Sequence, residues 1–331
     1  MKKPYSGTRR SVVFALAAAG CGWLGVAAAA SDAYPSKPVR MLVGFAAGGA
    51  VDNVARQLGQ GLSQRLGQAV VIENKPGATG TIAAEAAAKS PGDGYTLLLG
   101  TQSTMLVAPS VYPKLGFKPL QDFVPISLVA SVPLVLVAHP SVPARNIKEL
   151  IELARSKDGG LMYASSGQGG PQHVASELLA QMAGIKLGHV PYKGEAIALN
   201  DVLGNQVPIM FGNLPTLLPH IRSGKVRAIA VSSLQRSEAA PDIPTIAESG
   251  LPGFEALTWF GVFAPISTPK PVVDRLLNDI NQTLADPAAK GKLQAQGLTV
   301  MGNNPDQFRA YMKTETVKWA KLVESAHIKP E

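Results

Sequence analysis

The sequence is poor in the residues that build metal and redox sites. Of its 331 residues only Cys21 is a cysteine, and it lies in an N-terminal segment that we expect to be removed. The rest of the chain then has no thiol, which excludes disulfides, cysteine–metal sites and cysteine nucleophiles. The five histidines are His139, His173, His189, His220 and His327. None pairs with another at metal-ligand spacing and H-E-x-x-H does not occur, so we expect no metal site.

Sequence fingerprints of nucleotide binding and of serine hydrolysis are absent as well. Residues 167–172 fail the G-x-G-x-x-G pattern at its last position, and no G-x-x-x-x-G-K-S/T stretch occurs. The nucleophile-elbow pattern G-x-S-x-G is also missing. The sequence therefore predicts no cofactor and no catalytic residue.

Charge is sparse, and the positive excess is concentrated at the N-terminus. Charged residues make up 16% of the chain and hydrophobic residues 46%, a composition that excludes disorder for the bulk of the chain. Part of the net charge of +8 comes from Lys2, Lys3, Arg9 and Arg10, and without them 27 basic residues stand against 23 acidic ones. The remaining positive charge is scattered, so we expect no nucleic-acid partner.

The first 30 residues have the pattern of a cleaved export signal. A basic head ending at Arg10 is followed by an uncharged, alanine-rich stretch that closes on Ala28, Ala29 and Ala30. A membrane anchor is the alternative, because the 19 uncharged residues 12–30 approach the length that spans a bilayer. Residues 8–11 weakly resemble a twin-arginine signal, and residues 19–21 weakly resemble a lipoprotein site. We predict cleavage near Ala30 and an exported protein in the periplasm.

From residue 34 onward, short apolar runs alternate with helical patterns, which predicts an α/β fold built around parallel sheets. The strands are expected at residues 39–45, 69–73, 95–100, 134–138, 161–165, 189–192, 207–211 and 226–232, and residues 256–264 form an apolar, partly aromatic run. The helices are expected at residues 52–66, 81–89, 147–156, 172–183, 197–203, 271–284, 287–296 and 305–325. Residues 109–125 hold four prolines and are interpreted as less regular.

Two glycine-rich turns, residues 45–50 and 165–170, each join an expected strand to an expected helix. Such turns place backbone N–H groups at a helix N-terminus, an environment that suits anions. Neither turn contains lysine or arginine, which favours reversible capture of a small carboxylate. The pairing of two such turns predicts two lobes facing each other. The alternative is that the glycines only allow tight chain reversal.

Several polar residues near these turns are candidates for ligand contacts. Thr101, Ser103, Ser165 and Ser166 follow expected strands, where a hydroxyl binds a ligand or caps a turn. His173 adjoins the second turn and has either a ligand-binding or a first-turn role. Asp52 lies near a helix start, where a carboxylate is interpreted as structural.

Five blocks in the mature chain resemble the Bug-type (TctC-like) receptors of tripartite tricarboxylate transporters. They are YPSKPVR at 34–40, VIENKPGA at 71–78, DGYTLL at 93–98, HVPYKG at 189–194 and PDIPT at 241–245. The blocks occur in the family's order over essentially the whole mature chain. The resemblance implies a type II-like periplasmic-binding-protein fold with a ligand cleft between two α/β lobes. Lobe 1 would hold residues 31–131 plus 256–331, and lobe 2 residues 132–255, with crossings near 128–136 and 254–263.

The resemblance also implies a small organic carboxylate as ligand and a two-component membrane permease of the tripartite type as partner. It implies that the two turns, together with the hydroxyl groups after the third expected strand, form the carboxylate-binding site. With the neighbours considered above, the expected ligand-binding residues are Phe45, Ala46, Ala47, Gly48, Gly49, Thr101, Ser103, Ser165, Ser166, Gly167, Gln168, Gly169, His173, Phe211, Gly212 and Asn213.

Two departures from the family pattern bear on the ligand. Ala46 and Ala47 stand where the family's first turn commonly has two prolines, and Gly212 stands where many members have aspartate. Without that aspartate an ammonium group would lack a partner, so we expect a dicarboxylate or an aromatic acid without an α-amino group. Two other roles stay open, namely a carboxylate sensor that signals to a membrane kinase and an exported hydrolase.

Overall fold

The computed structural model describes residues 34–112, 114–192 and 194–328. Residues Pro35–Glu331 form one compact unit. The predicted export signal, with its alternatives at Cys21 and at the twin arginines, lies outside the described residues.

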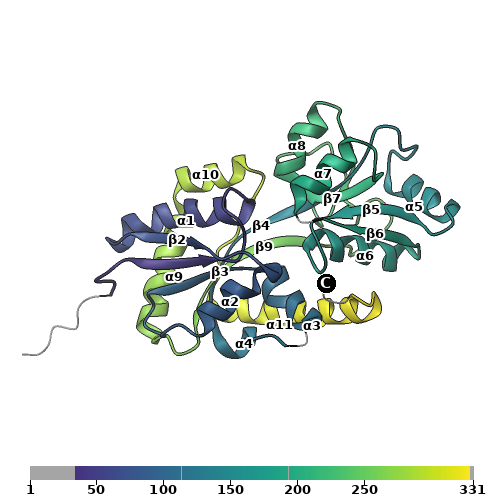
Figure 1. The fold of residues 1–331 in the computed structure, drawn as a ribbon. Helices are drawn as coiled ribbons and strands as arrows, with labels where there is room; N and C mark the ends of the chain where they lie inside the picture. Colours follow the sequence, from purple (N-terminus) through teal and green to yellow (C-terminus); the bar gives the residue numbers. More distant parts are fainter. Residues whose placement is uncertain (1–33, 113, 193, 329–331) are drawn as a thin grey trace, which may run out of the picture. The chain divides into compact units, whose positions relative to one another are not determined.

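The first part of the chain builds a parallel β–α–β arrangement (Figure 1). Strand β1 is the centre of it and pairs in parallel with β2 on one side and β3 on the other. Its elements are β1 (Val39–Val43), α1 (Ala50–Leu66), β2 (Val70–Asn74), α2 (Thr81–Ala88) and β3 (Thr96–Thr101). Helix α1 buries Val51, Val54, Leu58 and Leu62, the spacing that places one apolar face against a sheet. It ends at Gly67, which has the left-handed φ of 68° typical of a helix C-terminus.

Strands β4 (Phe123–Ala138) and β9 (Leu257–Pro265) connect the two halves of the sheet. They run antiparallel, with Val124 opposite Ala264 and Ser131 opposite Trp259. Beyond Pro133, β4 changes partners and pairs with β7 and β8. The strand begins earlier than the sequence predicted, because residues 123–125 were interpreted as less regular and residues 126–133 were not assigned to any element. Proline is tolerated here because the pairing shifts register at Pro125.

The middle of the chain builds a second parallel group, in which β5 pairs with β6 and with β7. Its elements are α5 (Ile147–Ser156), β5 (Leu161–Ser165), α6 (Pro171–Ala183), β6 (Leu187–Pro191), α7 (Glu195–Leu203), β7 (Ile209–Asn213), α8 (Leu214–Arg222) and β8 (Arg227–Val231). The sequence predicted all of these except α8. The full strand order is β2-β1-β3-β9-β4-β7-β5-β6, with β8 and β10 also on β4.

The C-terminal segment returns to the first group of strands. After β9 come α9 (Lys270–Ala285), α10 (Pro287–Ala295), β10 (Thr299–Val300) and α11 (Pro305–Ser325). Arg65 of α1 donates to Gln282 of α9 at 2.6 Å, which ties the C-terminal helices to the N-terminal ones. The remaining short elements are Ala78–Gly80, a π-helical turn at Ser103–Val107, Ala108–Val111 (α3) and Pro119–Asp122 (α4).

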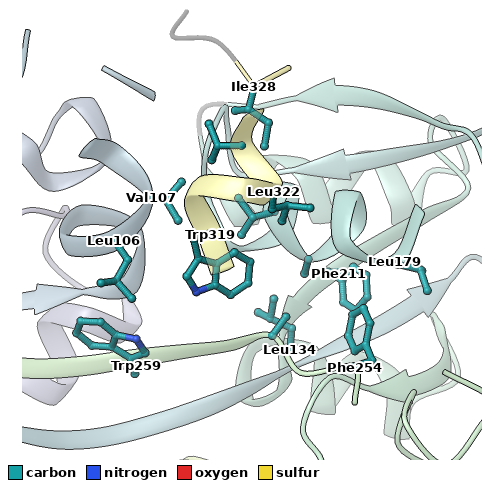
Figure 2. Close-up of a cluster of buried hydrophobic side chains, with 14 of the residues drawn as sticks. Leu106, Val107, Leu134, Leu179, Phe211, Phe254, Trp259, Trp319, Leu322 and Ile328 are labelled. Carbon is teal, nitrogen blue, oxygen red and sulfur yellow. The ribbon is translucent and has the colours of Figure 1, made fainter. Parts of the chain in front are cut away.

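One apolar cluster packs α11 against both groups of strands (Figure 2). Trp319 and Leu322 of α11 lie near Leu106 and Val107 on one side and near Leu134 on the other. Trp319 is only 1% exposed. Fully burying side chains of this size stabilises the fold by about 2–3 kcal/mol each. The last helix therefore belongs to the core and holds the framework around the site.

Candidate functional site

A cavity of about 960 Å³ is lined by segments from both groups of strands. The β1–α1 turn, the end of β3 and part of β9 contribute from the first group. The starts of α6, α7 and α8 contribute from the second, and residues 295–298 contribute from the C-terminal segment. The volume lies at the upper end of the range for small-molecule sites.

The first turn is the most complete part of the predicted site. Phe45, Ala46, Ala47, Gly48 and Gly49 all line the cavity, followed by the first residues of α1. Gly48 has φ of +84°, a conformation that side chains disfavour, so the turn needs glycine at this position.

Asp52 holds the first turn in place. This carboxylate is 1% exposed and accepts hydrogen bonds from Gly48 N–H, Arg56 Nε and Asn74 Nδ2, each at 2.9 Å. Asn74 also donates to the carbonyl of Phe45 at 3.0 Å. Burial alone would raise the pKa of Asp52, but the hydrogen bonds from Arg56, Gly48 and Asn74 outweigh it and lower the pKa. The structural interpretation of Asp52 therefore fits its contacts.

Four helices begin at the cavity: α1, α6, α7 and α8. Their first residues line it, and their N-cap positions are Gly49, Gly170, Gly194 and Asn213. Within the described chain none of these four caps makes a side-chain hydrogen bond to its own helix. By contrast, α5, α10 and α11 are capped by asparagine or aspartate side chains. Uncapped helix starts carry unpaired N–H groups and the positive end of the helix dipole, and both favour an anion.

Hydroxyl groups supply further hydrogen-bonding capacity around the cavity. Thr101, Ser103, Ser166 and Thr258 all line it. The Oγ1 of Thr258 is buried without a hydrogen-bond partner in the described chain, and so is the Oδ1 of Asn213. Buried polar atoms without partners are uncommon in proteins, so both atoms are available to a polar ligand.

The second turn reaches the cavity only in part. Ser166 lines it, whereas Ser165, Gly167, Gln168 and Gly169 are not among the lining residues. Ser165 Oγ lies 2.6 Å from His189 Nε2 and contacts Gly167. These contacts place the rest of the turn behind Ser166, where it supports the wall.

Three other predicted site residues also lie behind the lining. His173 is buried, and its Nδ1 accepts a hydrogen bond from Gly169 N–H at 3.0 Å. Phe211 is fully buried and stacks on Phe254, as Figure 2 shows. Gly212 lies beneath the wall, whereas the next residue, Asn213, lines the cavity. Ligand contact by these residues stays a prediction.

Sequence reasoning missed Glu195, the first residue of α7. Its two carboxyl oxygens accept hydrogen bonds from Asn213 N–H and Asn213 Nδ2, each at 2.6 Å. Burial raises the pKa of Glu195 to about 7, against the lowering effect of the two Asn213 bonds. The only sequence signal was an acid directly after Gly194, two residues before the expected start of the helix at residue 197. Thr258, Gln172 and Arg222 were missed as well, and all three line the cavity.

The part of the chain that the structure describes contains neither a metal-binding group of side chains nor a helix suited to span a membrane. No group of three or more histidine, cysteine, aspartate or glutamate side chains in residues 34–328, apart from 113 and 193, is arranged to hold a metal ion. Over the same residues, no helix combines the length and the apolar character needed to span a bilayer.

Comparison with known proteins identifies relatives that match most of the chain. The family model described as "Tripartite tricarboxylate transporter family receptor" (TctC) matches residues 54–328. The protein BugT of Bordetella pertussis is 40% identical over 301 residues, covering 90% of this chain and 92% of BugT.

Two solved structures are similar over the same extent. The periplasmic binding protein BugD is 42% identical with a TM-score of 0.79, covering 90% of this chain and all of BugD. The R. palustris protein Rpa4515, solved with adipate, is 35% identical with a TM-score of 0.82, covering 90% of this chain and all of Rpa4515. These matches confirm the predicted family and the predicted two-lobed α/β fold. The chain therefore belongs to the TctC family of tripartite tricarboxylate transporter receptors and has the fold of periplasmic binding proteins.

Proposed function

We propose that this protein captures a small organic carboxylate in the periplasm. The observation that carries the proposal is the meeting of helix N-termini at one cavity, where the starts of α1, α6 and α7 have no side-chain cap and their N–H groups suit an anion. Rpa4515 was solved with adipate, a dicarboxylate, which supports the same ligand chemistry. A dicarboxylate or an aromatic acid is the ligand class expected from the sequence, with the sixteen predicted residues as its site.

A thermal-shift panel of carboxylates tests the proposal directly. A ligand present at a hundred times its dissociation constant stabilises the native state by about 2.7 kcal/mol, which raises the melting temperature measurably. Calorimetry then gives the affinity of each acid that shifts the melting temperature. A panel of mono- and dicarboxylates without any stabilising member would contradict the proposed ligand class.

The proposed partner is the two-component membrane permease of a tripartite transporter, to which the loaded receptor delivers its ligand. The family description supports this role. A sensor that reports to a membrane kinase is the second candidate. Deletion of the gene distinguishes the two roles: loss of uptake supports delivery, whereas loss of induction with normal uptake supports sensing.

We also propose that the protein is a receptor without enzymatic activity. The hydroxyl groups of Thr101 and Ser166 at the cavity contact Thr104 and Gln172 rather than a histidine or a carboxylate, so neither is paired with a general base as a nucleophile requires. Incubation with esters and amides tests this proposal. Saturable turnover would favour the hydrolase alternative.

The export signal and the lobe boundaries remain proposals. Mass spectrometry of the exported protein is expected to find a chain that starts near Ser31, and a lipid on Cys21 or retention of residues 1–30 would contradict cleavage. The proposed boundaries, 31–131 plus 256–331 against 132–255, are supported by the change of β4 partners beyond Pro133. Limited proteolysis that cuts first near residues 132 or 255 would support them.

A further inference from the structure

Glu195 places an acidic side chain on one wall of a cavity whose other walls favour anions. Among the described lining residues it is the one acid, and Arg222, an exposed residue in the last turn of α8, is the one base. Within the described chain, no cation forms an ion pair with Glu195. Its carboxyl group is therefore the one acidic group among the described lining residues of a cavity whose other walls favour anions.

The carboxyl group of Glu195 already occupies the anion site at the start of α8. Asn213 is the N-cap of that helix, and both its N–H and its Nδ2 donate to Glu195 at 2.6 Å. A ligand carboxylate at this wall would meet the charge of Glu195 instead of free donors. Each carboxyl oxygen keeps a second acceptor position, so the group still accepts a hydrogen bond from a ligand.

The space for this carboxyl group exists because residue 212 is glycine. A Cβ added to Gly212 would lie 2.8 Å from Glu195 Oε1 and 2.6 Å from Leu217 Cδ1. The sequence analysis excluded an amino group because Gly212 supplies no carboxylate. The structure overturns that premise, since Glu195 places a carboxyl group beside Gly212.

The burial of the Glu195 carboxyl group makes its ionised form sensitive to the ligand groups that lie beside it. Burial raises its pKa to about 7, which shows that the ionised form is poorly solvated. A desolvated carboxylate gains more from a ligand hydrogen-bond donor than one in water does, and it repels a second anion more strongly.

We propose that Glu195 is a specificity-determining residue and that its carboxylate accepts a hydrogen bond from an ammonium or hydroxyl group of the ligand. The ligand then carries a carboxylate toward the first turn and a hydrogen-bond donor toward the start of α7. This inference rests on the proposed function and narrows its ligand class to carboxylates that bear such a donor. A dicarboxylate that also bears a hydroxyl or an ammonium group satisfies both the proposed function and the assignment of Glu195.

Matched acids test the assignment by calorimetry at pH 8, where Glu195 is ionised. Succinate, malate and aspartate share one carbon skeleton and differ in carrying hydrogen, hydroxyl or ammonium. Glutarate, 2-hydroxyglutarate and glutamate form the matching five-carbon series. The wild-type protein is expected to bind a substituted acid about tenfold or more tightly than its unsubstituted parent, because a hydrogen bond to a charged group is worth that much.

The variant Glu195→Gln keeps the size of the side chain and removes the charge. It is expected to reduce the preference to about threefold or less, since the amide accepts only as a neutral group. Glu152→Gln on α5, an exposed position, removes the same charge elsewhere and is expected to keep the wild-type preference. A preference for ammonium alone identifies a charged donor group on the ligand, and a preference shared by hydroxyl shows that a neutral donor suffices; both support the assignment.

Two results would overturn it while leaving the proposed function intact. One is tighter or equal binding of succinate and glutarate by the wild-type protein. The other is a preference that Glu195→Gln leaves unchanged. Binding of none of the six acids by either form would also overturn the assignment of Glu195, whereas the carboxylate role itself is decided separately by the thermal-shift panel of mono- and dicarboxylates.

Discussion

The imidazole rings of His173 and His189 stack with their centroids 3.9 Å apart, directly behind the second glycine-rich turn. His189 also stacks on Tyr163, whose hydroxyl donates to Glu177 at 2.7 Å. Burial lowers the pKa of His173 to about 3 and that of His189 to about 4, and the neighbouring ring adds to the lowering at His173. Both rings are neutral at physiological pH, and each holds one residue of the turn through a hydrogen bond.

This pair predicts a loss of stability in mild acid, which the protonation of Glu195 partly offsets because its pKa is raised to about 7 in the folded chain. The unfolded chain takes up protons at the histidines below about pH 6.5, whereas the folded chain resists until about pH 4. The contribution of the two histidines to stability is therefore complete above pH 6.5 and falls as the pH drops toward 4, by at most about 1.4 kcal/mol per pH unit for each histidine. Urea unfolding at pH 7.5 and pH 5 measures the loss.

The variant His189→Asn isolates the contribution of one ring. It cannot take up a proton, so its loss of stability between pH 7.5 and pH 5 is expected to be smaller than that of the wild-type protein. An equal loss in both proteins would show that other groups cause the acid sensitivity.

Replacing Asp52 is expected to loosen the first turn. Asp52→Asn removes the charge that pairs with Arg56 and weakens the bond to Gly48 N–H, at a cost of about 1–2 kcal/mol. Ligand affinity is expected to fall because the turn lines the cavity. Calorimetry and thermal melting measure both effects, and a variant with wild-type affinity would show that the turn keeps its shape without the carboxylate.

Gly49 permits a direct test of a backbone donor in the first turn. Its φ of −80° lies close to the value that proline imposes, so Gly49→Pro removes the N–H with little strain. Gly49→Ala keeps the N–H, and its Cβ would lie 3.5 Å from Ala46 O, an ordinary contact. We expect affinity to fall about tenfold in the proline variant and to stay near the wild-type value in the alanine variant. Equal affinities would mean that this N–H does not bind the ligand.

Gly212→Ala is expected to displace the Glu195 carboxyl group or the Leu217 side chain, because both lie within 3 Å of the added Cβ. Such overpacking costs about 1–3 kcal/mol. Gly291→Ala in α10 is the matched control, since its Cβ meets open space and a helical alanine is neutral or stabilising. Chemical denaturation compares the two variants, and equal stability would show that the wall adjusts freely.

Ligand binding is expected to depend on pH through Glu195. The raised pKa of about 7 means that the carboxylate, the form that best accepts a hydrogen bond, becomes dominant above pH 7. Affinity for an ammonium- or hydroxyl-bearing acid therefore rises between pH 6 and pH 8, where both histidines stay neutral. Calorimetry across this range measures the change, and Glu195→Gln should flatten it. A fall in affinity with rising pH would indicate that the protonated group is the one that binds.

Local patterns predicted the regular elements of this fold well. Helices α5 and α11 have the predicted bounds, because a capping asparagine and a clear apolar face mark each of them. The failures are concentrated at prolines. Pro215 and Pro219 hid α8, and Pro125 and Pro133 hid the first two-thirds of β4. Proline weakens a local pattern, but the helix start at Pro215 and the register shift at Pro125 both tolerate it, and only the partner strands show the register shift.

The part of the site that a single chain segment forms could be predicted from the sequence, whereas the parts where several segments meet could not. The first turn lies at the cavity because its glycines, strand and helix are contiguous in the sequence. Glu195 and Gly212 are seventeen residues apart, and nothing local indicates that the side chain of one fills the space left by the other. Their relationship depends on the pairing of strands and the packing of helices, which a single sequence does not display.

The position of β9 sets the order in which the chain can fold. In the sheet it lies between β3 and β4, although more than a hundred residues separate it from either in the sequence. During synthesis the N-terminal strands therefore have no neighbour on that side until residue 265 has emerged, whereas the middle group, β5 to β8, is contiguous and needs no later strand. The half of the molecule that is made first is completed last, and until then it exposes an unpaired strand edge that a chaperone would have to protect.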